Sequence, residues 1–297
     1  MIKFIKTLGG NALPLRHIAI VLTLVWLGTF VLIPHLLVLV TSFLSPDSQH
    51  LAVWPMNATA YQRLWEQLYA DVFLHSLWLA CLATLICLGI GYPFAYILAK
   101  LPRVWRNVCL FLMIVPFWTN SLIRTYAIKL MLGNKGLVNT VLVGIGVSDA
   151  PIELLYTEFA VIFGLVYVLL PFMVLPLVSS FIKLDSTLLE AARDLGATFW
   201  QRLRYIILPL TMPGIIAGGL MVFLPAMGMF YVADLLGGAK NLLVGNIIKN
   251  QFLVVRDWPF GAALSVALML MMAILLWFYA LANRRIHRVG GLDDENL

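Results

Sequence analysis

Hydrophobic residues in this chain are collected into six long runs that are separated by shorter polar segments. A helix needs about 20 mainly apolar residues to cross the hydrocarbon core of a bilayer, and each run has this length. The runs cover residues 17–43, 72–99, 108–131, 158–182, 210–233 and 261–283. The pattern therefore predicts an all-α membrane protein with six transmembrane helices.

Composition agrees with a membrane protein, since 62% of the residues are hydrophobic, 11% are charged and the mean hydropathy is +0.95. Soluble domains are about half apolar and about a quarter charged. The first run is too long for a signal-peptide core and no small-residue cleavage site follows it, so we expect it to remain as an anchor. We expect three parts: an N-terminal segment (1–16), a membrane domain (17–283) and a C-terminal tail (284–297).

The distribution of charge predicts the orientation. Thirteen of the twenty basic residues, but six of the fourteen acidic ones, lie before the first run, between the second and third, between the fourth and fifth, or after the sixth. The positive-inside rule places these segments, and so both termini, in the cytoplasm. The basic residues form no stripe with interleaved aromatics, so the net charge of +6 does not indicate nucleic-acid binding.

The loop between the fourth and fifth runs, residues 184–209, is polar and has helix-capping signals. Thr187 and Glu190 have the spacing of a capping box, which predicts a helix from Thr187 to about Leu195. Gly196 then ends it in the left-handed conformation. The result is either a rigid docking element or an ordinary amphipathic helix at the membrane surface.

A second short helix is predicted directly after the first. Thr198 and Gln201 repeat the capping-box spacing, and Pro209 is expected to close this helix before the next apolar run. Gly214 and Gly218, in that run, form a small-xxx-small pair that predicts a close helix contact.

The sequence contains no GxxxxGK[ST] nucleotide-binding loop, and residues 237–241 lack its spacing. The chain is therefore not expected to be an enzyme or to hydrolyse ATP, and a separate subunit would have to do so. Cys81, Cys87 and Cys109 have no metal-ligand spacing, so neither a metal nor another cofactor is expected.

Two segments on the opposite side of the membrane are candidate docking surfaces for a soluble protein. The first is a short element at 58–64, with Tyr61 and Leu64 on one helical face. The second is an amphipathic helix within 241–255. Both could instead lie on the lipid headgroups.

The polar loop resembles the EAA loop of ABC importer permeases, whose pattern is EAA, three residues, Gly, nine residues, Ile, one residue and Leu-Pro. All of these positions match between Glu190 and Pro209. In that family the loop contains a coupling helix that fits a cleft on the cytoplasmic ATPase. The resemblance implies this coupling role for Glu190, Ala191, Ala192, Asp194 and Gly196.

Four further stretches, 116–124, 164–173, 230–241 and 256–261, resemble one subfamily, the PotB-type permeases of spermidine/putrescine importers. The resemblance covers residues 20–285 and implies a type I (MetI-like) permease in the bacterial inner membrane. It also implies that the chain forms half of a polyamine pathway together with a second, PotC-like permease. Its other expected partners are a cytoplasmic ATPase dimer and a periplasmic polyamine-binding protein.

Residues that could line a polyamine pathway lie near the fifth run. Asp234 is the only acid within or beside that run, and Phe230 and Tyr231 can attract ammonium groups through their rings. If the helix persists through Asp234, the three share a face. Trp118 is a second aromatic candidate or a membrane-interface anchor. Lys249 either pairs with an acid, regulates entry or lies on a solvated face.

Other functions remain open at this level. The permease could transport another small cation or a peptide-like solute. An ATP-independent secondary transporter would need its own ion-coupling acids and inverted repeats, and no convincing repeat is present. A membrane scaffold protein would not need the docking loop.

Overall fold

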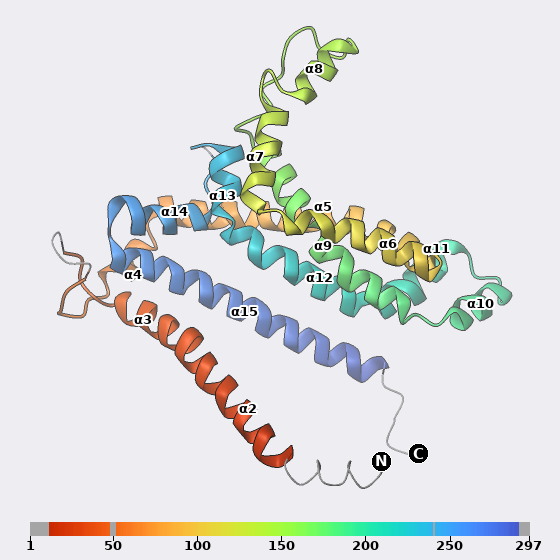
Figure 1. The fold of residues 1–297 in the computed structure, drawn as a ribbon, viewed down its shortest axis with the longest axis horizontal. Coiled ribbons are helices and arrows are strands. Elements are labelled where there is room, and N and C mark those ends of the chain that lie inside the picture. The colour runs from red at the N-terminus through yellow and green to blue at the C-terminus, as the bar shows by residue number, and fades with distance from the viewer. Residues whose placement is uncertain (1–11, 48–51, 240, 291–297) are drawn as a thin grey trace. The chain divides into compact units, whose positions relative to one another are not determined.

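The computed structural model describes residues 12–47, 52–239 and 241–290, and these residues are mainly helical (Figure 1). The chain divides into two compact units. The first contains the residues up to Trp65 together with 250–268, and the second contains 66–249 together with the residues from 269 onward.

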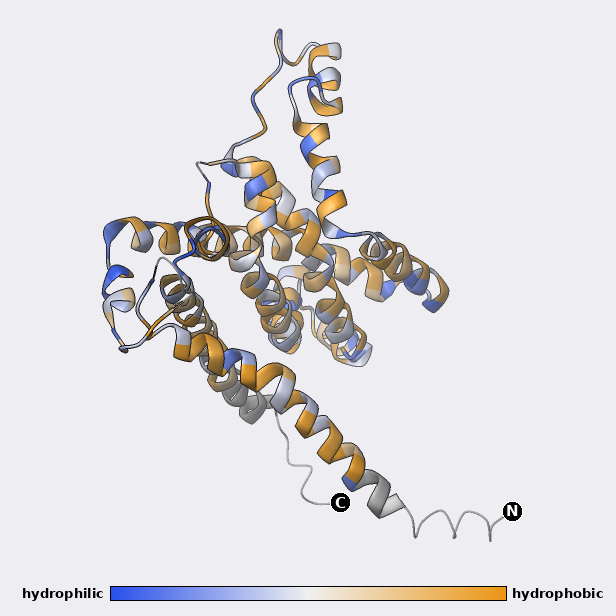
Figure 2. Ribbon diagram, turned by 60° about the vertical axis from the view of Figure 1, so that its left-hand side comes forward, coloured by the Kyte–Doolittle hydropathy of each residue, from blue (hydrophilic) through white to orange (hydrophobic). Residues whose placement is uncertain are grey.

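The first unit begins with one long apolar helix. It is made of α2 (Ala12–Leu27), the π-helical turn η1 (Gly28–Leu32) and α3 (Ile33–Thr41), which follow one another without a break. Its side chains from Ile18 onward are mostly exposed. Most of these residues are hydrophobic, as the orange colour of this helix in Figure 2 shows. Exposed apolar side chains around a whole helix suit a lipid environment, so the first predicted span is confirmed.

The short element that was predicted between the first two spans forms α4 (Thr59–Arg63). The Tyr61 hydroxyl lies 2.7 Å from Ser42 Oγ, and the Tyr61 ring centroid lies 5.0 Å from that of Phe43. Tyr61 is thus fixed against the segment that follows α3.

Arg63 joins α4 to the start of α15 (Trp258–Gly290) within the same unit. Its guanidinium lies 2.6 Å from Asp257 Oδ2 and 4.0 Å from the centroid of the Phe260 ring. Asp257 also accepts the Phe260 backbone N–H at 3.1 Å, so this carboxylate caps α15 as well as pairing with Arg63.

Three helices form the core of the second unit: α5 (Gln67–Lys100), α9 (Glu158–Ile182) and α12 (Leu208–Gly228). Glycines allow α12 to approach α9 closely. A Cβ on Gly214 would lie 2.3 Å from Ser180 Oγ, and one on Gly218 would lie 2.8 Å from Met173 Sδ. The predicted small-residue contact is therefore confirmed.

The third predicted span, 108–131, is broken. The chain runs through α6 (Arg103–Ile114) and the 3₁₀ turn η2 (Val115–Trp118), then bends by 92° into α7 (Ser121–Leu132) and α8 (Leu137–Gly144). Asn120 starts the new helix, because its side chain accepts the Leu122 backbone N–H at 2.9 Å. Five described helices are long and apolar enough to cross a membrane, or six if the bent pair is one span.

The fourth predicted span matches α9, and the sixth matches the apolar part of α15. The fifth begins earlier than predicted, because α11 (Phe199–Arg202) continues through the π-helical turn η3 (Leu203–Ile207) into α12. Pro209 does not close a helix. It is the second residue of α12, directly after the π-helical turn, and the helix continues through it.

Candidate coupling and translocation sites

The polar loop forms α10 (Ser186–Asp194), but it begins one residue before the predicted start. The N-cap is Asp185, whose Oδ1 accepts the Thr187 backbone N–H at 2.9 Å. The capping box predicted from Thr187 and Glu190 is therefore wrong. Thr187 already lies inside the first turn, and Glu190 is exposed on the helix surface.

The hydrogen bond from the Thr187 backbone, with a second from its side chain, holds the pKa of the Asp185 carboxyl below its ordinary value. A carboxyl with a lowered folded-state pKa stabilises the fold above its unfolded pKa. This contribution is lost as pH falls through the folded pKa. The cap is thus complete at neutral pH and is lost only in acid.

We expect Asp185→Ala to loosen the first turn of α10, because its backbone N–H groups lose their acceptor. Asp185→Asn should behave like the parent at neutral pH, since asparagine caps equally well. Amide hydrogen exchange over 186–190 measures the effect. Equal protection in the alanine variant and the parent would show that the cap does not stabilise α10.

The end of α10 has the predicted left-handed glycine. Gly196 has a φ of +79°, and its N–H donates to the Arg193 carbonyl at 2.9 Å. The Ala197 N–H donates to the Ala192 carbonyl at 2.9 Å, which completes a Schellman motif. The second predicted capping box is also confirmed: Thr198 and Gln201 cap α11 reciprocally.

The side chains of this loop are available to a partner. Glu190, Ala191, Asp194 and Gly196 are exposed and Ala192 is half-buried. Large apolar side chains lie along the same loop, with Leu195 89% and Trp200 73% exposed. Exposed apolar side chains between charged ones are typical of a protein interaction surface.

The second candidate site begins where α12 ends. The helix was expected to reach residue 233, but Met229 leaves the helical conformation, with φ −75° and ψ +63°. Gly245 makes the break possible: a Cβ there would lie 2.6 Å from the Gly228 carbonyl oxygen. Asn246 then donates to the Phe230 carbonyl at 2.9 Å. The fifth predicted span was therefore wrong at both ends.

Asp234 lies beyond this break, on the π-helical turn η4 (Ala233–Gly237), which follows α13 (Phe230–Val232). Its Oδ2 forms an ion pair with Lys249 Nζ, and its Oδ1 accepts a hydrogen bond from Asn246 Nδ2. The Asp234 and Lys249 side chains are 34% and 26% exposed. Of the alternatives left open for Lys249, the structure shows the pairing with an acid.

Aromatic rings lie beside this pair. Lys249 Nζ is 5.6 Å from the centroid of the Phe230 ring, which stands edge-on to Tyr231 with centroids 6.0 Å apart. The structure thus brings Phe230, Asp234 and Lys249 to one place, with Tyr231 next to them. Trp118 is 75% exposed and contacts the Phe111 ring instead, with centroids 5.9 Å apart.

Asn246 cannot be identified from the sequence, because one asparagine within an amphipathic helix gives no signal of its partner. It is fully buried at the start of α14 (Val244–Asn250), where its side chain also accepts the Leu243 backbone N–H at 3.0 Å. Its amide therefore holds the position of Asp234. Within the described residues, no group of three or more His, Cys, Asp or Glu side chains could hold a metal ion.

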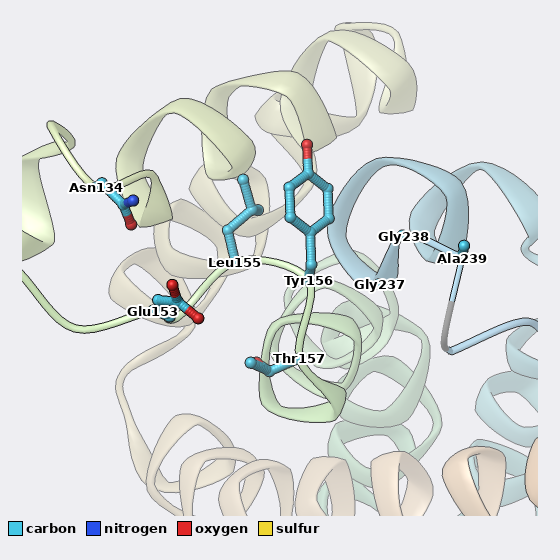
Figure 3. Close-up of a pocket in the computed structure, with 8 residues that line it drawn as sticks. All are labelled: Asn134, Glu153, Leu155, Tyr156, Thr157, Gly237, Gly238 and Ala239. Atoms are coloured by element: carbon cyan, nitrogen blue, oxygen red, sulfur yellow. The ribbon is translucent and has the colours of Figure 1, made fainter.

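A hollow of about 680 Å³ lies at the other end of η4 (Figure 3). Glu153 and Asn134 lie on one side of Tyr156, and Gly238 and Ala239 lie on the other. Tyr156 has a φ of +65° and donates its backbone N–H to the Leu236 carbonyl at 2.8 Å. No pattern in the sequence indicates this hollow. A carboxylate, an amide and a phenol ring together are suited to an alkylammonium group.

Comparison with known proteins identifies the class of this chain. Residues 91–288 match the family model of the binding-protein-dependent transport system inner membrane component, so the chain belongs to this family of importer permeases. The predicted fold class, a MetI-like ABC importer permease, is confirmed. The chain is thus a multi-pass inner-membrane protein of an ABC import system.

Individual relatives are more specific. The chain is 56% identical over 278 residues to the spermidine/putrescine transport system permease protein PotB of Haemophilus influenzae, covering 94% of this chain and 97% of the relative. It is also 56% identical over 268 residues to PotB of Escherichia coli K12, with 90% and 98% covered. These identities place the chain in the PotB family, as the sequence motifs predicted.

A solved structure with the same fold is a bacterial alginate ABC transporter in complex with an alginate pentasaccharide-bound periplasmic protein. Its matching chain has a TM-score of 0.75 and 17% identity, with 92% of this chain and 94% of that chain covered. At this identity the likeness shows the fold alone.

Proposed function

We propose that this chain forms half of the pathway through which an ABC importer brings polyamines into the cytoplasm. The observation that supports this most strongly is the near-full-length identity to spermidine/putrescine permeases. Its proposed partners are a second, PotC-like permease, a cytoplasmic ATPase dimer and a periplasmic polyamine-binding protein. The first alternative is a permease for another small cation or a peptide-like solute.

Coupling to ATP hydrolysis is assigned to α10 and the turn at Gly196. Two capped helices, joined by a Schellman turn, present Glu190, Asp194 and the exposed Leu195 on a rigid surface. A cytoplasmic ATPase can reach this surface only if the loop lies in the cytoplasm. The distribution of basic residues favours that orientation, with both termini on the same side.

Asp234 and Lys249 are assigned to an outer gate. In the structure the ammonium of Lys249 contacts the carboxylate of Asp234 and lies near the ring of Phe230. An ammonium group of a polyamine has the same chemistry, so it can replace Lys249 without leaving the carboxylate unpaired, which would be costly in a half-buried site. Tyr231 and the exposed Trp118 are proposed as further aromatic contacts.

The hollow lined by Glu153 and Tyr156 is assigned to the approach to this gate. Tyr156 contacts η4 through the Leu236 carbonyl and packs against Gly238, where a Cβ would lie 2.9 Å from the ring. A cation leaving Glu153 would therefore meet the turn of the chain that bears Asp234.

Reconstitution with defined subunits tests the assignment of half a pathway. We expect no ATP-driven spermidine uptake by vesicles that contain this chain alone, or this chain with the ATPase, because half of the pathway is missing. Adding the second permease and the binding protein should give uptake. Robust uptake without the second permease would instead show that this chain forms a homodimeric pathway.

Competition in the same vesicles tests the substrate class. Putrescine should reduce the uptake of labelled spermidine, while a dipeptide and a monovalent quaternary ammonium should not. Equal competition by the dipeptide would favour the alternative of a peptide-like solute.

A further inference from the structure

A smaller hollow of about 230 Å³ lies where α5 ends, α6 begins and α9 leads into α10. Two basic side chains, Lys100 and Arg106, line it together with the polar side chains of Tyr96 and Ser186. Its other walls are mainly apolar and include Phe181 and Leu189. The whole hollow belongs to the second unit, and none of its lining residues is acidic.

The two basic groups have no carboxylate partner among the residues that the structure describes. Lys100 Nζ lies 4.0 Å from the centroid of the Tyr96 ring, and Arg106 is half-buried. Asp185 is next to the lining residue Ser186 but does not line the hollow, and its Oδ1 is used to cap α10. Two positive charges beside one hollow repel each other unless an anion lies between them.

We infer that this hollow binds the phosphate of an anionic phospholipid headgroup. It lies where the apolar stretches of α5 and α9 end, which is the level of the headgroups. Arg106 and Lys100 can donate to phosphate oxygens, and the hydroxyls of Tyr96 and Ser186 add further donors. The apolar walls suit the glycerol part of the lipid. Basic pockets of this kind between transmembrane helices bind anionic headgroups.

The location of the hollow gives the lipid a role in coupling. Ser186 is the first residue of α10 and Leu189 follows one turn later, so both belong to the coupling helix. A bound headgroup would connect α10 to the ends of α5 and α6. Since a ligand stabilises the state that binds it, anionic lipid should favour the coupled position of α10.

The test uses the complete complex in vesicles of phosphatidylcholine, with and without phosphatidylglycerol. We expect phosphatidylglycerol to raise the ATP-driven uptake of the parent by about fivefold or more. The double variant Lys100→Gln/Arg106→Gln should lose this response. Arg103→Gln is the matched control, because Arg103 is exposed at the start of α6 and does not line the hollow. It should respond like the parent.

Lipid retention gives a second measurement that does not depend on transport. Native mass spectrometry of the purified complex should detect bound phosphatidylglycerol on the parent and on Arg103→Gln, and not on the double variant. If the double variant does not assemble, Arg106→Lys replaces it, since this change keeps the charge but removes the forked donor. It should bind the lipid more weakly than the parent.

Three results would overturn the inference. One is that Lys100→Gln/Arg106→Gln and Arg106→Lys respond to phosphatidylglycerol, and retain it, as the parent does. Another is full stimulation by inorganic phosphate or glycerol phosphate in phosphatidylcholine vesicles, which would make a free phosphate the ligand. The third is a loss of ATPase binding by the double variant that is equal in vesicles with and without phosphatidylglycerol. Lys100 and Arg106 would then pair with an acidic side chain of the ATPase. Spermidine uptake by the parent in phosphatidylcholine alone tests the proposed function separately.

Discussion

Replacing Gly196 with valine is expected to abolish ATP-driven uptake while leaving the protein in the membrane. Gly196 has a φ of +79°, a conformation that costs a residue with a side chain about 1–2 kcal/mol. Apart from the two residues next to Gly196 in the chain, no residue that the structure describes has an atom within 4 Å of the position that a Cβ would occupy. The valine side chain would therefore project into the space where the ATPase is proposed to dock. Membrane abundance, co-purification of the ATPase and uptake should be measured together.

Gly146 offers a matched control, because it also has a positive φ, of +73°, and open space around its Cβ position. It follows α8, far along the chain from the proposed coupling loop, so Gly146→Val has a similar backbone cost at a different surface. This variant should keep ATPase binding and uptake. Normal uptake by abundant Gly196→Val protein would show that the loop does not couple.

Replacing Asp234 with asparagine is expected to lower polyamine uptake by about tenfold, which corresponds to about 1.4 kcal/mol. Asparagine keeps the size of the side chain and can still bond to Asn246, but it no longer attracts an ammonium group. Tyr231→Ala should also lower uptake, through the loss of its ring. Neither change should alter the affinity of the separate binding protein.

Variants of Lys249 distinguish a gating role of the Asp234–Lys249 pair from a purely structural one. Lys249→Ala leaves Asp234 with its hydrogen bond from Asn246 but without a cation, so the polyamine no longer competes with an internal ammonium. It should lose less uptake than Asp234→Asn and need less polyamine for half-maximal uptake. The double variant Asp234→Asn/Lys249→Met removes the pair without leaving a lone charge. The complex should therefore assemble well, but its polyamine uptake should stay as low as that of Asp234→Asn. Parent-like uptake by Asp234→Asn over a full titration, with matched complex levels, would make Asp234 a structural acid.

Local features were predicted well where the residues that produce them lie within one or two helical turns of each other. The Gly196 turn and the Thr198–Gln201 capping box formed as expected, because each depends on residues that are close in sequence. The start of α10 was misplaced because Asp185 and Thr187 are both good N-cap residues, and only the backbone conformation shows which one is used. The prediction that Pro209 ends a helix was wrong for a related reason. A π-helical turn precedes this proline and the helix continues through it, and hydropathy does not reveal such a turn.

Hydropathy, caps and motifs are properties of contiguous residues, so the α-helical membrane fold, the permease class and the capped polar loop at 184–209 could all be read from the sequence. The tertiary structure, by contrast, sets the bend between α6 and α7 at Asn120 and the end of α12 at Gly228. It also decided that Asn246 and Lys249 meet Asp234, and that Lys100 and Arg106 line one hollow. These contacts join segments that are separate in the sequence. They depend on how closely the helix backbones approach, which no periodicity within either segment encodes.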